Sequence, residues 1–233
     1  MNDFRALRVC LLSLIVLAAA CNSELPTVAQ VQLSRVRIVN AAPGVGNVEV
    51  RTGSTPLVQN LNYGAFTQSC IQLPAGIPHT LGFRSGGAEV ATTTFTPVAN
   101  EEYTAFLTAS GATRRAFVLS DQTTAAAGTN GLRFVNASSG PGDVYVTVPG
   151  GEPTPAMRSY PDVEVAATGT AAIGYVTTDT TRTQVRFYDI GVATGTPRAE
   201  FRLSALPASR LATVVLTDVA TAGPSASFVV FPC

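Results

Sequence analysis

The sequence contains no lysine and no tryptophan, and His79 is its only histidine. The 15 basic residues are therefore all arginines, which are scattered along the chain and balanced by 15 acidic residues. Nucleic-acid-binding proteins need positive charge gathered on one face, so this distribution argues against a nucleic-acid partner. One histidine cannot build a multi-histidine zinc site, and no calcium-loop motif is present, so we expect no metal and no cofactor.

A long hydrophobic run is also missing. The longest apolar segment covers residues 9–20, about 12 positions with one serine among them, whereas a membrane-spanning helix needs about 20. Two arginines precede this segment, and three alanines end it immediately before Cys21. A basic start, a short apolar run and small residues are typical of a secretory signal, which we expect over residues 1–20.

The segment before Cys21 resembles a bacterial lipoprotein signal, in which the cysteine is lipidated and begins the mature chain. Ala18 stands where that pattern usually has leucine, and Leu17 lies one position further back. The resemblance implies a lipid anchor in the membrane, and Asn22 after the cysteine favours the outer membrane of the cell envelope. The alternative is an ordinary signal cleaved after Ala20, in which Cys21 has no special role.

The four cysteines have different expected roles. Cys10 lies inside the expected signal and Cys21 would carry lipid, which leaves Cys70 and Cys233. In an exported protein these two can form a disulfide, worth about 5 kcal/mol in the chain-entropy account. The alternative is a pair of buried thiols that lie too far apart to bond.

One stretch of the chain occurs twice, since residues 37–50 return as residues 133–146. Identical residues recur at a constant spacing in eight pairs: Arg37/Arg133, Val39/Val135, Asn40/Asn136, Ala41/Ala137, Gly44/Gly140, Gly46/Gly142, Val48/Val144 and Val50/Val146. Such agreement in a segment whose other positions vary indicates an internal duplication. Similar segments at 103–108 and 211–217 extend the duplication over most of the chain.

Short segments of alternating polar and apolar residues follow one another along the chain, separated by turns rich in proline and glycine. About seven such strands in each repeat are typical of an Ig-like β-sandwich. We therefore predict an all-β protein with two tandem Ig-like β-sandwich domains of the Greek-key type. The predicted parts are a signal peptide at 1–20, a lipid-anchored tether at 21–33, a first sandwich at 34–122, a linker at 123–130 and a second sandwich at 131–233.

The repeated segment also resembles a known family. The strand Arg35–Ala41, its proline and glycine turn and the strand after it are similar to the opening of the DUF4397 domain. Asp143–Val146 matches the family's second strand, and Leu73–Gly76 resembles its Leu-Pro-Ala-Gly turn. The family often has histidine where this chain has Asn40 and Asn136, so any role of that histidine is absent. The resemblance implies secreted or surface placement and no established activity.

The polar residues shared by the two repeats have structural explanations. We expect Arg37 and Arg133 on the outer face of a strand. Asn40 and Asn136 should end their strands and bond the backbone of the turn, as asparagine commonly does. The glycine-rich turns join strand to strand, so they lack the helix N-terminus that a phosphate-binding loop needs.

The remaining polar residues form no catalytic pattern. We expect His79 to lie in a solvent-exposed loop, since no serine elbow of a hydrolase accompanies it. Glu101 and Glu102 are neighbours, so on a strand they would point to opposite faces, and we expect both at a strand entrance facing water. We therefore predict no catalytic residue.

These observations favour a non-catalytic, lipid-anchored protein of the cell envelope that presents two β-sandwich modules for structural, adhesive or protein-interaction roles. The alternative is a carbohydrate- or polymer-binding module of the envelope, with a polysaccharide as partner. Sugars usually stack on exposed aromatic rings, and half-buried strand positions explain the available tyrosines equally well. Those candidates are Tyr63, Tyr145, Tyr160 and Tyr188. An enzyme with an atypical site is least favoured, because acid–base groups are scarce.

Overall fold

The computed structural model describes residues 30–110, 112–122, 124–138, 142–151, 158–163, 175–189, 191, 195–203, 211–217 and 226–233. Every regular element among these residues is a β-strand, which confirms the predicted all-β class. The described residues from Gln32 onward belong to one compact unit of the chain. In this part of the chain, no helix is long and apolar enough to cross a membrane.

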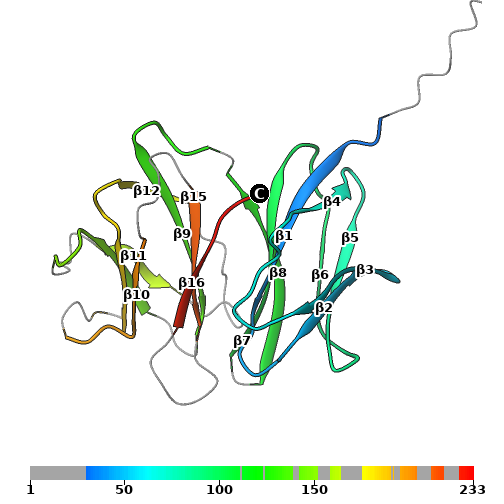
Figure 1. Cartoon of the computed structure of the whole chain (residues 1–233), viewed down its shortest axis with the longest axis horizontal. Helices are drawn as coiled ribbons and strands as arrows, with labels where there is room; N and C mark the ends of the chain where they lie inside the picture. The colour runs from blue at the N-terminus through cyan, green and yellow to red at the C-terminus, as the bar shows by residue number, and fades with distance from the viewer. Residues whose placement is uncertain are drawn as a thin grey trace, which may run out of the picture. The chain divides into compact units, whose positions relative to one another are not determined.

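The first sandwich consists of two four-stranded sheets. Sheet A has the strand order β4-β1-β7-β8 and sheet B the order β3-β2-β5-β6 (Figure 1). The strands are β1 (Leu33–Ala41), β2 (Val48–Thr52), β3 (Thr55–Leu61), β4 (Ile71–Pro74), β5 (His79–Ser85), β6 (Ala88–Phe95), β7 (Glu102–Ser110) and β8 (Thr113–Asp121).

Alternation along the strands sets the core of this sandwich. Leu81 and Phe83 of β5 are fully buried, whereas Thr80 between His79 and Leu81 is exposed on the other face of sheet B. They belong to one apolar cluster with Ile38 of sheet A. Fully burying a side chain of this size contributes about 1.5–3 kcal/mol, so the alternation fixes which face of each sheet turns inward.

The second sandwich repeats this arrangement. Sheet C has the order β12-β9-β15-β16 and sheet D the order β11-β10-β13-β14 (Figure 1). The strands are β9 (Thr129–Ala137), β10 (Gly142–Thr147), β11 (Arg158–Val163), β12 (Val176–Asp179), β13 (Gln184–Asp189), β14 (Ala199–Arg202), β15 (Leu211–Thr217) and β16 (Ala226–Val230).

The two sandwiches correspond strand by strand. In each, the first strand pairs in parallel with the seventh: Arg37 of β1 lies opposite Thr104 of β7, and Arg133 of β9 lies opposite Thr213 of β15. The remaining strands occupy the same places in the two pairs of sheets. The spacing of the sequence duplication and the strand registers therefore define the same equivalent positions.

Each sandwich contains a strand that the sequence analysis did not predict. Strand β3 lies at the edge of sheet B, contains Pro56 and has mostly exposed side chains, so it lacks the alternation of a half-buried strand. Its counterpart β11 contains Pro161 and follows an insertion. Strand β12 begins at Val176, and residues 164–174 before it lie outside the described residues.

Sheets A and C share a third apolar cluster, which joins the two sandwiches. Its buried members come from equivalent positions in the two repeats, such as Val39 with Val135 and Ala41 with Ala137. The cluster consists of Val39, Ala41, Phe66, Phe106, Phe117, Leu119, Val135, Ala137, Val215 and Val230. Contact between equivalent surfaces is the arrangement of a two-fold symmetric dimer interface, here formed within one chain.

Candidate functional site

The cysteines suggested by the sequence have separate positions. Cys70 and Cys233 form a disulfide with their Cα atoms 5.8 Å apart, and the bond joins the loop before β4 to the segment after β16. Cys21, the expected lipidation site, lies outside the described residues. The two described cysteines therefore connect the sandwiches.

The expectation of an exposed His79 is wrong. His79 begins β5, and only 8% of its surface is exposed. Its Nε2 atom lies 2.8 Å from the carbonyl oxygen of Pro74 on sheet A. Because the side chain falls on the inward face together with Leu81, the ring connects the two sheets and has a structural role.

The expectation for the adjacent glutamates is wrong for one of them. Glu101 is exposed, as predicted, but Glu102 at the start of β7 is buried. Glu102 forms an ion pair with Arg35, its register partner on β1. The pairing across the parallel strands brings these groups together, and the two carboxylates do not converge on one site.

Arg37 and Arg133 do lie on the outward faces of sheets A and C, but they do not face water. Their exposed fractions are 8% and 2%, because the other sandwich covers each of them. Their position on the outer face is therefore as expected, and the covering sandwich removes them from water. A guanidinium that is removed from water needs hydrogen-bond partners, and each arginine finds them in both sandwiches.

Arg133 lies in a buried polar cluster. It forms an ion pair with Asp121 of β8 and donates a 3.0 Å hydrogen bond to the carbonyl oxygen of Ser120. Its Nε donates to the Thr213 hydroxyl at 3.0 Å, and its guanidinium carbon lies 4.7 Å from the ring centroid of Tyr175. These bonds satisfy the arginine from both sandwiches.

Asp121 accepts hydrogen bonds from two further residues in the same cluster. Besides Arg133, it accepts a hydrogen bond from the Thr104 hydroxyl at 2.6 Å and a longer one from the Tyr175 hydroxyl at 3.4 Å. Burial raises the pKa of the Tyr175 phenol to about 12, against the opposing effect of the Arg133 charge. The phenol therefore stays neutral and available as a donor over the physiological range.

Arg37 forms the equivalent cluster at the other end of the interface. It donates to the carbonyl oxygen of Thr67 at 2.7 Å, and at 3.4 Å to both Cys70 Sγ and the carbonyl oxygen of Pro232. Its Nε is buried without a hydrogen-bond partner among the described residues. Desolvation lowers the pKa of Arg37, only partly offset by the acidic Asp121 and Glu102.

The register makes these two clusters counterparts of each other. Leu119 lies opposite Thr104, and Val230 lies opposite the equivalent Thr213, so Leu119 and Val230 are equivalent. Two residues further along the chain, Asp121 therefore corresponds to Pro232. Strands β4 and β12 begin at residues that lie opposite the equivalent Val36 and Leu132. The residues immediately before these strands, Cys70 and Tyr175, are therefore counterparts. One end of the interface is closed by a disulfide and the other by an ion pair with a tyrosine.

The repeated asparagines bond their turns as expected. Asn40 donates to the carbonyl oxygens of Gly46 at 3.0 Å and Leu61 at 3.1 Å, and Gly46 adopts a positive φ of 76° that glycine tolerates. The side-chain oxygen of Asn136 accepts from the Ser138 amide at 3.0 Å. Both asparagines thus hold the exit of the first strand of their sandwich.

The tyrosine candidates provide no open stacking platform in the described part of the chain. Tyr145 and Tyr188 are 2% exposed and pack edge to face with ring centroids 5.5 Å apart. Tyr63 is half-buried, and the side chain of Tyr160 lies outside the description. A sugar would therefore need polar contacts instead of an aromatic face.

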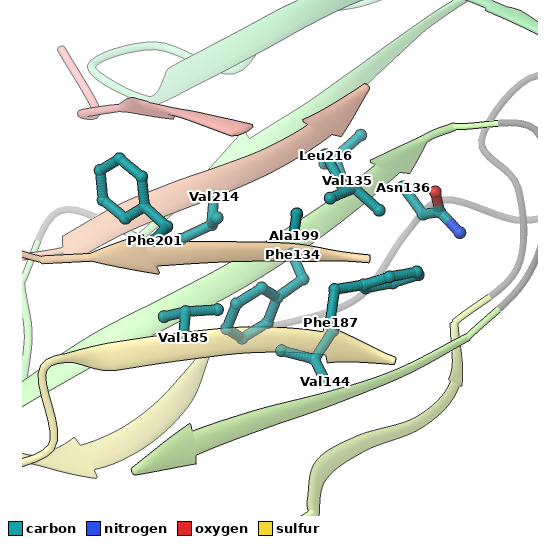
Figure 2. A pocket seen from close by; sticks show the side chains of 10 residues that line it. All are labelled: Phe134, Val135, Asn136, Val144, Val185, Phe187, Ala199, Phe201, Val214 and Leu216. Atoms are coloured by element: carbon teal, nitrogen blue, oxygen red, sulfur yellow. The ribbon is translucent and has the colours of Figure 1, made fainter. Parts of the chain in front are cut away.

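A small cavity lies inside the second sandwich. Figure 2 shows apolar side chains from both sheets converging on it, with Asn136 at one end. Its volume of about 20 Å³ is close to that of a single water probe, far below the several hundred Å³ of typical ligand sites. It is lined by Phe134, Val135, Asn136, Val144, Val185, Phe187, Ala199, Phe201, Val214 and Leu216. We regard it as a packing space.

A polar groove lies on the outward face of sheet B. Its volume is about 430 Å³, and its lining comes from β2, β5 and β6 and the turn after β2. The lining residues are Arg51, Gly53, Thr80, Gly82, Arg84 and Glu89. This groove was not predicted from the sequence, because its floor depends on a single glycine within a strand. Such a glycine indicates a close approach only once the strand pairing is known.

The charges in the groove are partly engaged. Arg51 forms an ion pair through its Nε with Glu49, at 2.5 Å, and Arg84 donates to the carbonyl oxygen of Gly87. Glu89 has no hydrogen-bond or ion-pair partner among the described residues, and a Cβ placed on Gly82 would lie 3.0 Å from its Oε2 atom. The groove therefore offers an unused carboxylate beside guanidinium groups.

Part of the chain matches a known protein family. Among the described residues, no three histidine, cysteine or acidic side chains are grouped so that they would hold a metal ion. No curated protein matches the chain. Residues 34–147, which run from β1 to the end of β10, match the family described as Domain of unknown function (DUF4397).

Proposed function

We propose that this chain is a non-catalytic, lipid-anchored protein of the cell envelope that presents two joined β-sandwiches for structural, adhesive or protein-interaction roles. The observation that carries the proposal is that the buried charges at the interface bind each other across the two sandwiches. Arg133 and Asp121 bind each other and their neighbours across the interface, so they hold the two sandwiches in one arrangement. An arrangement that separated the pair would leave an uncompensated buried charge and would therefore be disfavoured.

The anchor and the second copy belong to the same proposal. Cys21 carries the lipid in the outer membrane, and residues 22–33 tether the sandwiches to it. The duplicated sequence and the common strand order support a second DUF4397 copy in the second sandwich, whose first two strands lie at the end of the matched segment. With sheets A and C turned toward each other, sheets B and D carry the outward faces for partners.

Two measurements test this proposal. Growth with a labelled fatty acid should label the wild-type chain, and the Cys21→Ser variant should lose the label. The purified chain should turn over none of a broad panel of glycosides, peptides and esters. Turnover that survives repurification and is lost in a point variant of the described residues would contradict the non-catalytic role.

A carbohydrate-binding module of the envelope is the second candidate. The groove on sheet B favours it, since its size falls within the range of small-molecule sites and its lining is polar. A glycan array probed with the purified chain tests this candidate, and a uniform background signal would remove it.

A further inference from the structure

The two sandwiches provide an internal comparison for the groove. Val50 pairs with Phe83 in sheet B, and the equivalent Val146 pairs with Val185 in sheet D. One position earlier on the central strand, Gly82 in the first sandwich therefore corresponds to Gln184 in the second. The same register makes Arg84 and Glu89 the counterparts of Arg186 and Glu200.

In the second sandwich this place is filled by a carboxamide. Gln184 is only 1% exposed, although it lies on the outward side of its strand. Its Oε1 accepts from the Gly150 amide at 2.8 Å, and its Nε2 donates to Glu200. Partial burial raises the pKa of Glu200, but the hydrogen bonds from Gln184 and Arg186 outweigh this and hold it below its usual value.

In the first sandwich the same place is open. Gly82 has no side chain, and the carboxylate of Glu89 lies over the vacant space without a bonded partner among the described residues. Arg51 lines the opposite wall and uses only its Nε for Glu49. The groove thus retains an acceptor and a donor around a space that an amide occupies in the counterpart.

We propose that the groove at Gly82 binds the acetamido group of an N-acetylated amino sugar, in the position that the Gln184 carboxamide fills in the second sandwich. The amide N–H donates to the Glu89 carboxylate, and the amide carbonyl accepts from the Arg51 guanidinium. The hydroxyls of Thr80 and Thr94, 2.8 Å apart, lie on the same face for contact with sugar hydroxyls. This inference rests on the second proposed function, the carbohydrate-binding module, and names the chemistry of its ligand.

The position of the groove favours a sugar over a peptide. Extended peptides usually add to a sheet edge through backbone hydrogen bonds or lay apolar side chains into a groove. This groove instead lies over the face of the central strands β2 and β5, and its lining consists of arginine, glutamate, threonine and glycine. Such a lining matches an amide and hydroxyl groups.

The test is saturation-transfer NMR on the full chain in a detergent that carries no sugar. The probe is tri-N-acetylchitotriose, and the matched control is cellotriose, which has hydroxyls in place of the acetamido groups. We expect the strongest transfer on the acetyl methyl protons of the probe and no transfer to cellotriose. Equal signals from the two sugars, or no signal from either, would overturn the inference.

Two variants locate the binding. Gly82→Gln should weaken binding at least about tenfold, because its own carboxamide would occupy the space; the added Cβ meets only the flexible carboxylate of Glu89. Glu89→Gln removes the charged acceptor and should weaken binding about tenfold, since hydrogen bonds to charged groups are worth more than neutral ones. The exposed Glu101→Gln is the matched control and should bind normally. Unchanged binding in both groove variants would refute the assignment.

Further outcomes separate this inference from the proposed function. Displacement of the sugar by a short glutamine-containing peptide at lower concentration would mean that the groove takes a peptide amide, which overturns the sugar assignment. Hydrolysis of the bound probe in the same sample would support the acetamido site and contradict the non-catalytic role. Absence of binding with no turnover would remove only the acetamido site.

Discussion

At the scale of single residues, the arginine that the duplication repeats has different binding partners in the two copies. Arg37 and Arg133 occupy equivalent positions, but Arg133 binds a carboxylate and Arg37 binds carbonyl and sulfur atoms. The sequence predicted their outward direction, because alternation along the strand assigns it. It did not predict their burial, because the covering groups come from the other sandwich and are distant in the sequence.

The ion pair at this interface predicts a large effect of neutralising one partner. Asp121→Asn should lower the free energy of unfolding by about 3–5 kcal/mol, since it leaves the Arg133 charge buried without a counter-charge. Urea denaturation measures this change. Glu49→Gln, which breaks the more exposed pair with Arg51, is the control and should cost less than about 1 kcal/mol. Equal losses in the two variants would contradict the burial of Arg133.

The phenol of Tyr175 predicts a dependence of stability on alkaline pH. Its pKa is raised to about 12 in the folded chain, above its ordinary value of 10.0. The folded state therefore holds this proton more tightly, so the contribution is complete below pH 10 and is lost as the pH rises toward 12. Denaturation curves between pH 9 and about 12 should show a steeper loss for the wild type than for Tyr175→Phe. Identical slopes would mean that the phenol titrates normally.

At the scale of elements, alternation and turn residues were sufficient to predict most strands. Strands such as β5 and β13 were found because apolar residues alternate with other residues along each of them. Strands β3 and β11 were missed, since edge strands with proline and exposed side chains carry no such pattern. The polar groove could not be predicted from the sequence, because the pairing of Gly82 with Arg51 exists only in the folded sheet.

The segment after β16 depends on the disulfide for its attachment. The bond spans 163 residues of sequence, and the chain-entropy account gives about 5 kcal/mol for so long a loop. The double variant Cys70→Ser with Cys233→Ser should therefore unfold at a lower temperature, and hydrogen exchange in β16 should accelerate. Reducing agent should reproduce the effect in the wild type and leave the variant unchanged. A wild type that is insensitive to reduction would contradict this contribution.

At the scale of the whole molecule, the shared cluster between sheets A and C couples the two sandwiches. The fully buried Phe106 stacks on Phe117, with ring centroids 5.3 Å apart, beside residues of the second sandwich. The chain should therefore unfold in one calorimetric transition, with calorimetric and van't Hoff enthalpies in agreement. Phe106→Ala, expected to cost about 3–5 kcal/mol, should weaken this coupling when combined with reduction. Two separate transitions in the oxidised wild type would contradict the coupling.

The parallel pairing of β1 with β7 has a consequence for the kinetics of folding. Arg35 and Glu102 are register partners, and the hydrogen bond between them spans 67 positions of sequence. The edge of β1 that pairs with β7 therefore stays unpaired until most of the first sandwich has been synthesised. Chains dominated by such distant contacts fold in about milliseconds to seconds, and their unpaired strands are prone to aggregation in that interval. The interval before β7 arrives is thus the time when the unfolded chain is most exposed to aggregation.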